Sequence, residues 1–303
     1  METANSVLDL IGKTPMLKIN RLVDQRGAAL YAKLEWYNIG GSVKDRMALY
    51  LLNSAAAAGK LDKGKTILEA TSGNTGIALA MIAAVKGYPV AVVMPESASI
   101  ERRKIIKAYG AELILSPAEK GTGGAIEVKQ RLLRENPNKY VDINQFEDPA
   151  NIQAHYETTG KEIIEQTGGR VDMVIVGIGT AGTGVGVSMR VKEHSRGIKV
   201  IGVTPKIGTG IQGLRNPKEA NPTKLFREEY FDEVIELGDE DMPRIFELAK
   251  ELARNEGLFV GASSAAVMHV ALEKASKLGK DKTVVAILPD NGDKYLSTNL
   301  FSL

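Results

Sequence analysis

The chain has 303 residues, of which 44% are hydrophobic and 25% are charged, values typical of a soluble globular protein with one large or two ordinary domains. A net charge of +2, without Lys/Arg-rich runs or interleaved aromatic residues, gives no support for nucleic-acid binding. The absence of cysteine excludes disulfides, thiolate metal sites and a cysteine nucleophile.

The sequence indicates neither a metal-binding protein nor a secreted or membrane protein. The histidines His155, His194 and His269 stand far apart without the spacing of a metal site, so no metal ligands are predicted. The first nine residues lack a basic region followed by an apolar core, and no apolar run is long enough to span a bilayer. We therefore expect a cytoplasmic protein without a membrane or nucleic-acid partner.

Local patterns predict strands and helices that alternate along most of the chain. A short helix is expected over residues 6–11, followed by strands over 17–19 and 30–34 and a helix that begins at Lys44 and ends at Gly59. Next come strands over 66–70, 90–94, 113–115 and 140–143, with helices over 75–86, 99–109 and 124–133. The series restarts with helices over 149–166 and 182–194 and strands over 171–176 and 199–203. After an irregular stretch, 204–226, come strands over 233–237 and 283–288 and helices over 239–255 and 263–277.

This alternation is typical of α/β proteins, in which parallel strands carry helices on both faces. Because the series restarts near residues 144–149, we expect two three-layer α/β/α domains with mostly parallel, twisted sheets. Ligands of such sheets bind beyond the carboxyl ends of the strands, so we expect functional residues in the loops that lead from strand to helix.

Lys44 lies at the start of an expected helix. A helix N-terminus disfavours the ammonium form of a lysine, and Schiff-base chemistry requires a neutral amine. The alternative for Lys44 is an ordinary solvated lysine.

The stretch TSGNTG, residues 71–76, joins an expected strand to a helix. Its hydroxyls, its amide and the free N–H groups of a helix N-terminus suit a carboxylate. A helix N-cap with turn glycines is the alternative.

The stretch GIGTAGTG, residues 177–184, also follows an expected strand. It suits a phosphate, because glycines let backbone N–H groups approach the oxygens and Thr180 and Thr183 add hydroxyls. It also fits the dinucleotide fingerprint, but that motif expects an acidic residue where the next strand ends, at Thr204. A single phosphate group is therefore favoured. A lysine amine, a carboxylate loop and a phosphate loop together indicate pyridoxal 5′-phosphate (PLP) and an amino-acid substrate.

Seven stretches resemble the cysteine synthases, also called O-acetylserine sulfhydrylases, and residues 208–226 look more like the B-type enzyme. The stretches are GSVKDR (41–46), TSGNTG (71–76), MPESASIERRK (94–104), QF (145–146), GTAGT (179–183), GASS (261–264) and YLST (295–298). The resemblance implies a homodimer of the fold type II PLP enzymes, which are similar to the tryptophan synthase β subunit. It also implies a larger cofactor-phosphate domain of residues 1–34 and 147–303 and a smaller substrate-binding domain of residues 35–146.

The resemblance further implies roles for individual residues. Lys44 would form the Schiff base with PLP, Asn74 would contact the 3′-oxygen, and Ser263 would face the pyridine nitrogen. The residues implied for the cofactor phosphate are Gly179, Thr180, Ala181, Gly182 and Thr183. Those implied for the substrate are Thr71, Ser72, Gly73, Thr75, Gln145 and Arg215. Ala181 departs from the family, which usually has glycine there.

The implied reaction is a β-replacement that makes L-cysteine from O-acetyl-L-serine and sulfide, with Lys44 moving the α-proton. O-phosphoserine as the donor and a cystathionine β-synthase-like enzyme with another thiol remain alternatives, and serine acetyltransferase is the candidate protein partner. A nucleotide-binding regulatory protein built on the loop at Gly177 is an alternative of another class.

Overall fold

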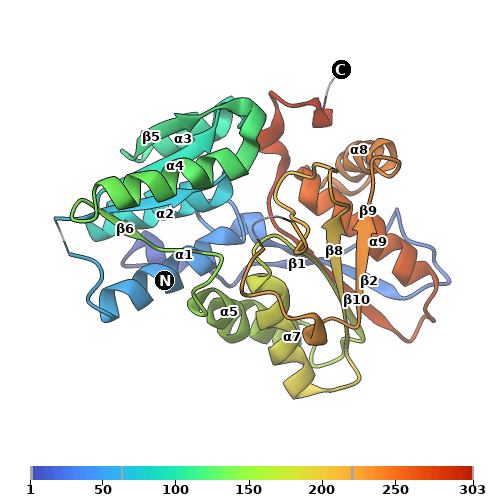
Figure 1. Cartoon of the computed structure of the whole chain (residues 1–303). Helices are drawn as coiled ribbons and strands as arrows, with labels where there is room; N and C mark the ends of the chain where they lie inside the picture. The colour runs from blue at the N-terminus through green and yellow to red at the C-terminus, as the bar shows by residue number, and fades with distance from the viewer. Residues whose placement is uncertain (1–2, 63, 220–221, 302–303) are drawn as a thin grey trace.

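The computed structural model describes residues 3–62, 64–219 and 222–301, and its strands form two separate sheets (Figure 1). The larger sheet has six strands in the order β1-β2-β10-β7-β8-β9. These strands are β1 (Met16–Lys18), β2 (Ala29–Leu34), β7 (Met173–Gly177), β8 (Lys199–Pro205), β9 (Glu233–Leu237) and β10 (Thr283–Leu288). All neighbours are parallel except β1 and β2.

The smaller sheet has four parallel strands in the order β5-β4-β3-β6. They are β3 (Thr66–Ala70), β4 (Val90–Pro95), β5 (Glu112–Ser116) and β6 (Tyr140–Asp142). Helix α4 (Gly121–Glu135) packs on one face, and the other face is covered by α1 (Lys44–Ala57), α2 (Asn74–Lys86) and α3 (Ile100–Ala108).

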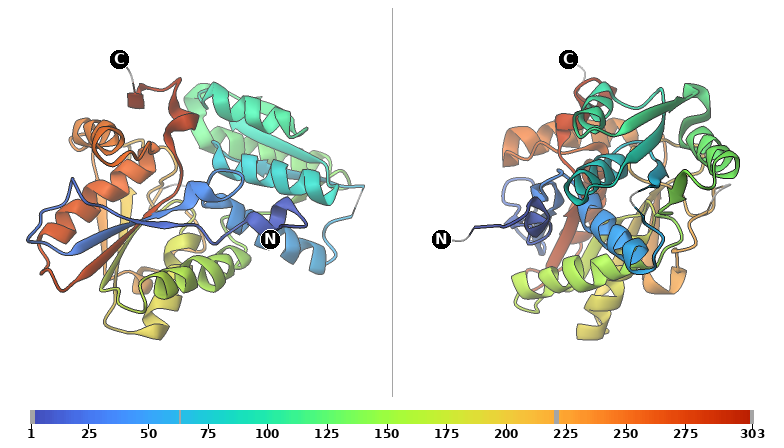
Figure 2. Two further views of the ribbon diagram at one scale, coloured as in Figure 1. Left: turned by 180° about the vertical axis from the view of Figure 1, so that it is seen from behind. Right: turned by 90° about the vertical axis from the view of Figure 1, so that its left-hand side faces the viewer.

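Helices also cover both faces of the larger sheet (Figure 2). One face packs against α8 (Met242–Glu251) and α9 (Ala262–Ser276). The other face packs against α5 (Ala150–His155), α6 (Lys161–Gln166) and α7 (Gly182–His194). The expected pair of three-layer α/β units is therefore confirmed.

Three expected helices differ in detail from the structure. The helix expected over residues 239–255 is α-helical over Met242–Glu251 and ends in a π-helical turn, Leu252–Glu256. The helix expected over residues 149–166 is interrupted by a π-helical turn, Tyr156–Gly160, between α5 and α6. The short helix near the N-terminus is a 3-10 helix, Val7–Leu10. Hydrophobic spacing alone does not distinguish these hydrogen-bond patterns, because the side chains fall on nearly the same face in each.

The chain crosses from the larger sheet to the domain of the smaller sheet directly after β2. Strands β1 and β2 precede α1 but belong to the larger sheet, whereas residues 66–142 supply every strand of the smaller one. The domain boundaries at residues 34 and 146 stay a prediction.

A buried network of charges lies beside the start of α1. The Arg46 guanidinium donates to Glu35 at 2.7 Å and to Glu162 at 2.6 Å, and Lys33 donates to Glu162 at 2.6 Å. Arg46 and Glu35 are fully buried. Burial raises the pKa of Glu162, but Arg46 and Lys33 outweigh this effect and lower it to about 2. The network joins α1 to β2 and α6, and so fixes the helix that carries Lys44.

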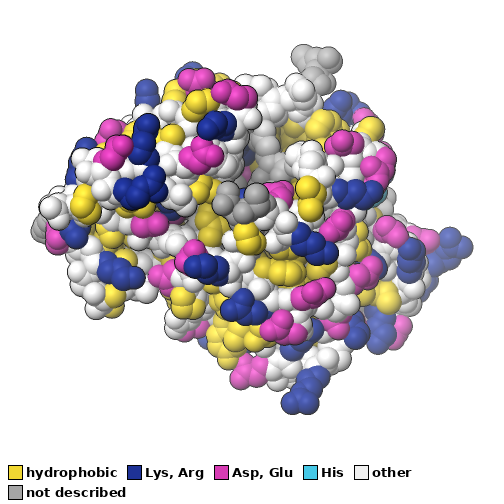
Figure 3. Space-filling model, viewed as in Figure 1, with side chains coloured by type: hydrophobic (Ala, Val, Ile, Leu, Met, Phe, Trp, Pro, Cys, Tyr) yellow, Lys and Arg dark blue, Asp and Glu magenta, His cyan; other side chains and the backbone are white. Residues whose placement is uncertain are grey.

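The described residues contain neither a helix long and apolar enough to cross a bilayer nor a group of three or more His, Asp or Glu able to hold a metal ion. Figure 3 shows Lys and Arg side chains interspersed with Asp and Glu over the face in view.

Candidate active site

A cavity of about 470 Å³ lies where the carboxyl ends of β3, β7 and β10 meet the start of α1. This is the place where parallel sheets bind ligands. Every predicted site residue except Gly182 lines it. These residues are Lys44, Thr71, Ser72, Gly73, Asn74, Thr75, Gln145, Gly179, Thr180, Ala181, Thr183, Arg215 and Ser263.

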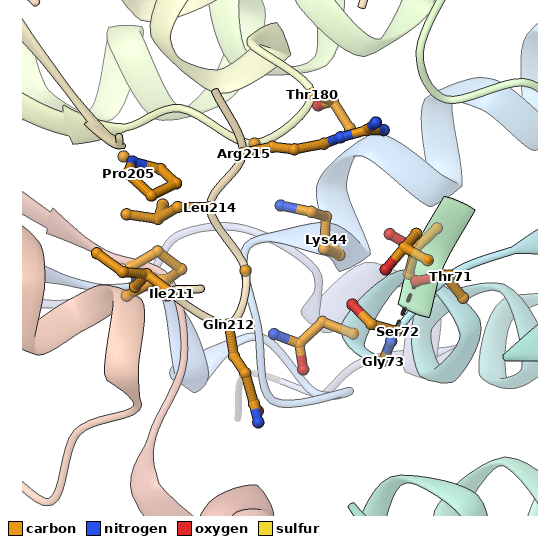
Figure 4. Close-up of a pocket in the computed structure, with 18 of the residues that line it drawn as sticks. Lys44, Thr71, Ser72, Gly73, Thr180, Pro205, Ile211, Gln212, Leu214 and Arg215 are labelled. Atoms are coloured by element: carbon orange, nitrogen blue, oxygen red, sulfur yellow. Dashed lines mark hydrogen bonds between the residues drawn. The ribbon is translucent and has the colours of Figure 1, made fainter. Parts of the chain in front are cut away.

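Lys44 is the first residue of α1, and its side chain points into the cavity between residues 71–73 and residues 211–215 (Figure 4). Burial lowers the pKa of Lys44, and Asp290 and Glu35 oppose this effect. The expectation of a readily formed neutral amine therefore agrees with the structure, although burial rather than the helix N-terminus is the main cause.

The loop over residues 71–76 holds hydroxyl groups above the end of β3. Thr75 donates its hydroxyl to Oε1 of Gln145 at 2.8 Å, and Oγ1 of Thr71 accepts from the N–H of Gly73 at 3.1 Å (Figure 4). The N-cap of α2 is Gly73, which makes no side-chain capping bond. The N-cap is thus one of the turn glycines of the loop, no hydroxyl caps the first turn of α2, and Ser72 is exposed to the cavity.

The glycine-rich loop after β7 is packed too closely for larger residues at two positions. A Cβ on Gly179 would lie 2.7 Å from the carbonyl oxygen of Gly213, and one on Gly182 would lie 2.0 Å from Oδ1 of Asn151. Gly182 thus packs against Asn151 on the side of the loop away from the cavity, which explains why it does not line the cavity. Ala181 adopts the left-handed conformation with a φ of 69°. This backbone explains the preference for glycine there, because alanine is strained in it by about 1 kcal/mol.

The two threonines of this loop are held from behind by polar side chains. The amide of Asn151 donates to Oγ1 of Thr180 at 3.0 Å, and Oγ1 of Thr183 lies 3.1 Å from Nε2 of His155. Burial, with the charges of Arg46 and Lys44, holds the pKa of His155 well below its usual value. His155 is therefore a neutral hydrogen-bonding partner of the loop.

Asp290, which is not among the predicted site residues, lies next to Asn74. Its Oδ2 accepts from Nδ2 of Asn74 at 2.8 Å and from the hydroxyl of Tyr295 at 2.9 Å, and an Arg102 nitrogen lies 3.9 Å away. Among the described residues, Oδ1 of Asn74 and Oδ1 of Asp290 are buried without a hydrogen-bond partner. Asp290 follows β10 at its carboxyl end, so the same rule that selected the two loops could have found it.

Ser263 lies in the first turn of α9 and is 2% exposed. The N-cap of this helix is Gly261, so the alternative that Ser263 is merely an N-cap is wrong. A Cβ on Gly213 would lie 3.1 Å from its hydroxyl, which places residues 208–216 against it.

If Ser263 contacts the pyridine nitrogen of PLP as predicted, Ser263→Ala should keep bound PLP, change its absorption spectrum and lose roughly 10-fold or more in turnover, because the ring nitrogen would lack a hydrogen-bond partner. The absorption spectrum and kcat of the purified variant test this expectation. An unchanged spectrum and rate would mean that Ser263 has no role in binding or tuning the cofactor.

Arg215 is half-buried and has partners within the protein. Its Nε donates to Glu219 at 3.2 Å, and its guanidinium lies 5.4 Å from the ring centre of Phe146. In the same loop, Gln212 accepts from Arg102 of α3 at 2.9 Å. The segment 208–216 is therefore held by α3 and, through the hydroxyl of Thr204, by β8, although its glycines predict a moving loop.

Three comparisons with known proteins agree with this geometry. Residues 7–290 match the family model described as "Pyridoxal-phosphate dependent enzyme". A cysteine synthase of Staphylococcus aureus (strain N315) is 40% identical over 98% of this chain and 97% of that protein. Cysteine synthase B of Escherichia coli (strain K12) is 43% identical over 96% and 94%. The crystal structure of cysteine synthase from Entamoeba histolytica has a TM-score of 0.90 and 38% identity, and covers 100% of this chain and 92% of that one.

Proposed function

Because this chain belongs to the family of pyridoxal-phosphate dependent enzymes, we propose that it makes L-cysteine from O-acetyl-L-serine and sulfide by β-replacement. PLP, when bound, supplies an electron sink for the carbon that loses its proton. The observation that carries the proposal is the meeting, in one cavity, of a lysine amine with a lowered pKa, a hydroxyl-rich loop and a glycine-rich loop.

The residues of the cavity fit PLP. Helix α7 begins at Gly182, and Thr180 and Thr183, on either side of this N-terminus, line the cavity with hydroxyls that suit a phosphate. Gly179 packs closely against Gly213 and has no side chain, so the loop presents its backbone at this position. The unpartnered Oδ1 of Asn74 and the hydroxyl of Ser263 offer polar contacts for the substituents and nitrogen of the ring.

The chain's own groups would then divide the work between binding and proton transfer. Thr71, Ser72, Thr75 and Gln145 bind the substrate carboxylate and fix the orientation of its α-carbon. The neutral amine of Lys44, once released from the cofactor, takes the α-proton and returns it after sulfide has added.

This function is tested by following the absorption spectrum of the purified protein. O-acetyl-L-serine is expected to change the spectrum, and sulfide is expected to restore it with the release of L-cysteine. If neither step occurs with a protein that contains PLP, the proposed function is wrong.

O-phosphoserine is the alternative donor, and Arg215 is the residue that would read its phosphate. Because Arg215 already pairs with Glu219, an incoming phosphate would have to compete with a carboxylate, which favours O-acetylserine. If Arg215 nevertheless binds phosphate, Arg215→Ala should lose O-phosphoserine activity by about 10- to 100-fold and keep O-acetylserine activity. Measurement of kcat/KM with both donors decides this, and equal small losses would leave Arg215 without a role in selection.

The nucleotide-binding alternative is not favoured. Thr204 at the end of β8 donates its hydroxyl to the carbonyl of Arg215 at 2.9 Å, in place of the acidic residue that a dinucleotide requires. A cytoplasmic homodimer with serine acetyltransferase as a partner remains part of the proposal.

A further inference from the structure

Helix α4 packs on one face of the smaller sheet (Figure 1). Lys129 is a buried cation on this helix. It is 5% exposed, and its neighbours on this face, Ala125 and Leu132, are apolar. Its ammonium donates to Oε1 of Glu69 at 3.2 Å and to Oδ1 of Asp142 at 2.9 Å. The two carboxylates belong to neighbouring strands, β3 and β6.

Both carboxylates lie just before a loop of the cavity. Glu69 is two residues before Thr71, and Asp142 is three residues before Gln145. Oδ1 of Asp142 also accepts from the N–H of Asn144 at 2.8 Å. Asn144 has a φ of 46°, so this bond fixes the turn that aims Gln145 at the cavity.

The backbone pairing of the two strands stops below these loops. Strand β6 has three residues, and its last pair with β3 is Leu68 with Asp142. Beyond that pair, the loops meet through the bond of 2.8 Å between Thr75 and Gln145. Lys129 therefore connects β3 and β6 at the end of their ladder, where the loops begin.

The ion pairs of Lys129 with Glu69 and Asp142 lie among apolar side chains, at a position that an apolar side chain could also fill. Burial raises the pKa of Glu69. Burial also disfavours the charged form of Lys129, but Glu69 and Asp142 outweigh this and raise its pKa. Since buried ion pairs often stabilise a fold no better than apolar residues of similar volume, a role in fixing geometry accounts better for these charges.

We propose that Lys129 is a positioning residue, which sets the spacing between the loop of Thr71 to Thr75 and the side chain of Gln145 by bridging Glu69 and Asp142. The inference rests on the proposed function, in which these two parts bind the carboxylate of the amino acid. Lys129 itself touches neither substrate nor cofactor.

The test compares Lys129→Met with Arg131→Met, which removes an exposed cation from the same helix. The readouts are kcat and KM for O-acetyl-L-serine, the Kd of the PLP-loaded protein for L-serine from its absorption change, and the Tm. For Lys129→Met we expect KM and Kd to rise about 10-fold and kcat to change less, with the resting spectrum unchanged. Arg131→Met is expected to match the wild type. A lower Tm with unchanged KM and Kd would mean a merely structural role and would overturn the proposal.

A second variant keeps the test decisive if Lys129→Met does not fold. Asp142→Asn keeps an acceptor for the N–H of Asn144 but removes one of the two charges that bind Lys129. It should raise KM and Kd about threefold, and unchanged values would contradict the proposal. A wild type that binds L-serine but makes no cysteine would refute the proposed function alone, because the Kd comparison still tests Lys129.

Discussion

Replacement of Lys44 by alanine is expected to reduce turnover roughly 10³-fold or more, because the variant loses the amine that we propose binds PLP and moves the α-proton. The stability should stay within about 1 kcal/mol of the wild type, since Lys44 is a partly buried first residue of α1 and not a core residue. Steady-state kinetics and urea denaturation measure the two effects.

Lys44→Arg is the matched variant, because it keeps a positive charge but cannot supply a neutral amine. It should be as inactive as Lys44→Ala. A comparable rate in either variant would mean that the reaction does not use the amine of Lys44.

The largest loss of stability is expected for Arg46→Met. This change leaves Glu35 and Glu162 without their guanidinium partner in the interior, and breaking such a buried pair costs about 3–5 kcal/mol. The free energy of unfolding from urea denaturation at pH 7 is the measurement. Arg244→Met, which breaks an ion pair of the half-exposed Arg244 with Glu251, should cost less than about 1 kcal/mol. Similar losses in the two variants would contradict the importance of the buried network.

The buried network of Arg46, Glu35 and Glu162 should also make the free energy of unfolding depend on pH in the acidic range. Because the pKa of Glu162 is lowered from 4.5 to about 2 in the folded protein, its contribution is fully present above pH 4.5 and is lost as the pH falls toward 2. This contribution is on the order of 3 kcal/mol in the wild type. In Arg46→Met, the decrease in stability over this range should be smaller, because the main cause of the lowered pKa is gone.

Local sequence patterns predicted the frame of the molecule well. Strands β3, β9 and β10 and helix α7 have the predicted bounds. Their apolar runs end at turn residues, and Gly59 and Gly87 have the positive φ expected of residues that end a helix. The loops at the strand ends then followed from the general rule for parallel sheets.

The contacts around the cavity could not be predicted in the same way, because they join residues far apart in the sequence. Asp290 meets Asn74 across 216 positions, and Arg102 meets Gln212 across 110. Nor does helix periodicity predict a buried lysine: Lys129 occupies a core position of α4 that an apolar side chain would ordinarily fill. Its partners appear only when β3 and β6 lie side by side.

The residue that binds the cofactor can be identified most directly by reduction of the PLP-loaded protein with sodium borohydride, which makes the bond between PLP and a lysine permanent. Proteolysis and mass spectrometry then locate the added mass. We expect it on the peptide that contains Lys44, with none on the peptide that contains the nearby buried Lys294, whose ammonium donates to the carbonyl of Gly41 at 2.6 Å. Labelling of Lys294 or of any other lysine in place of Lys44 would contradict the proposed active site.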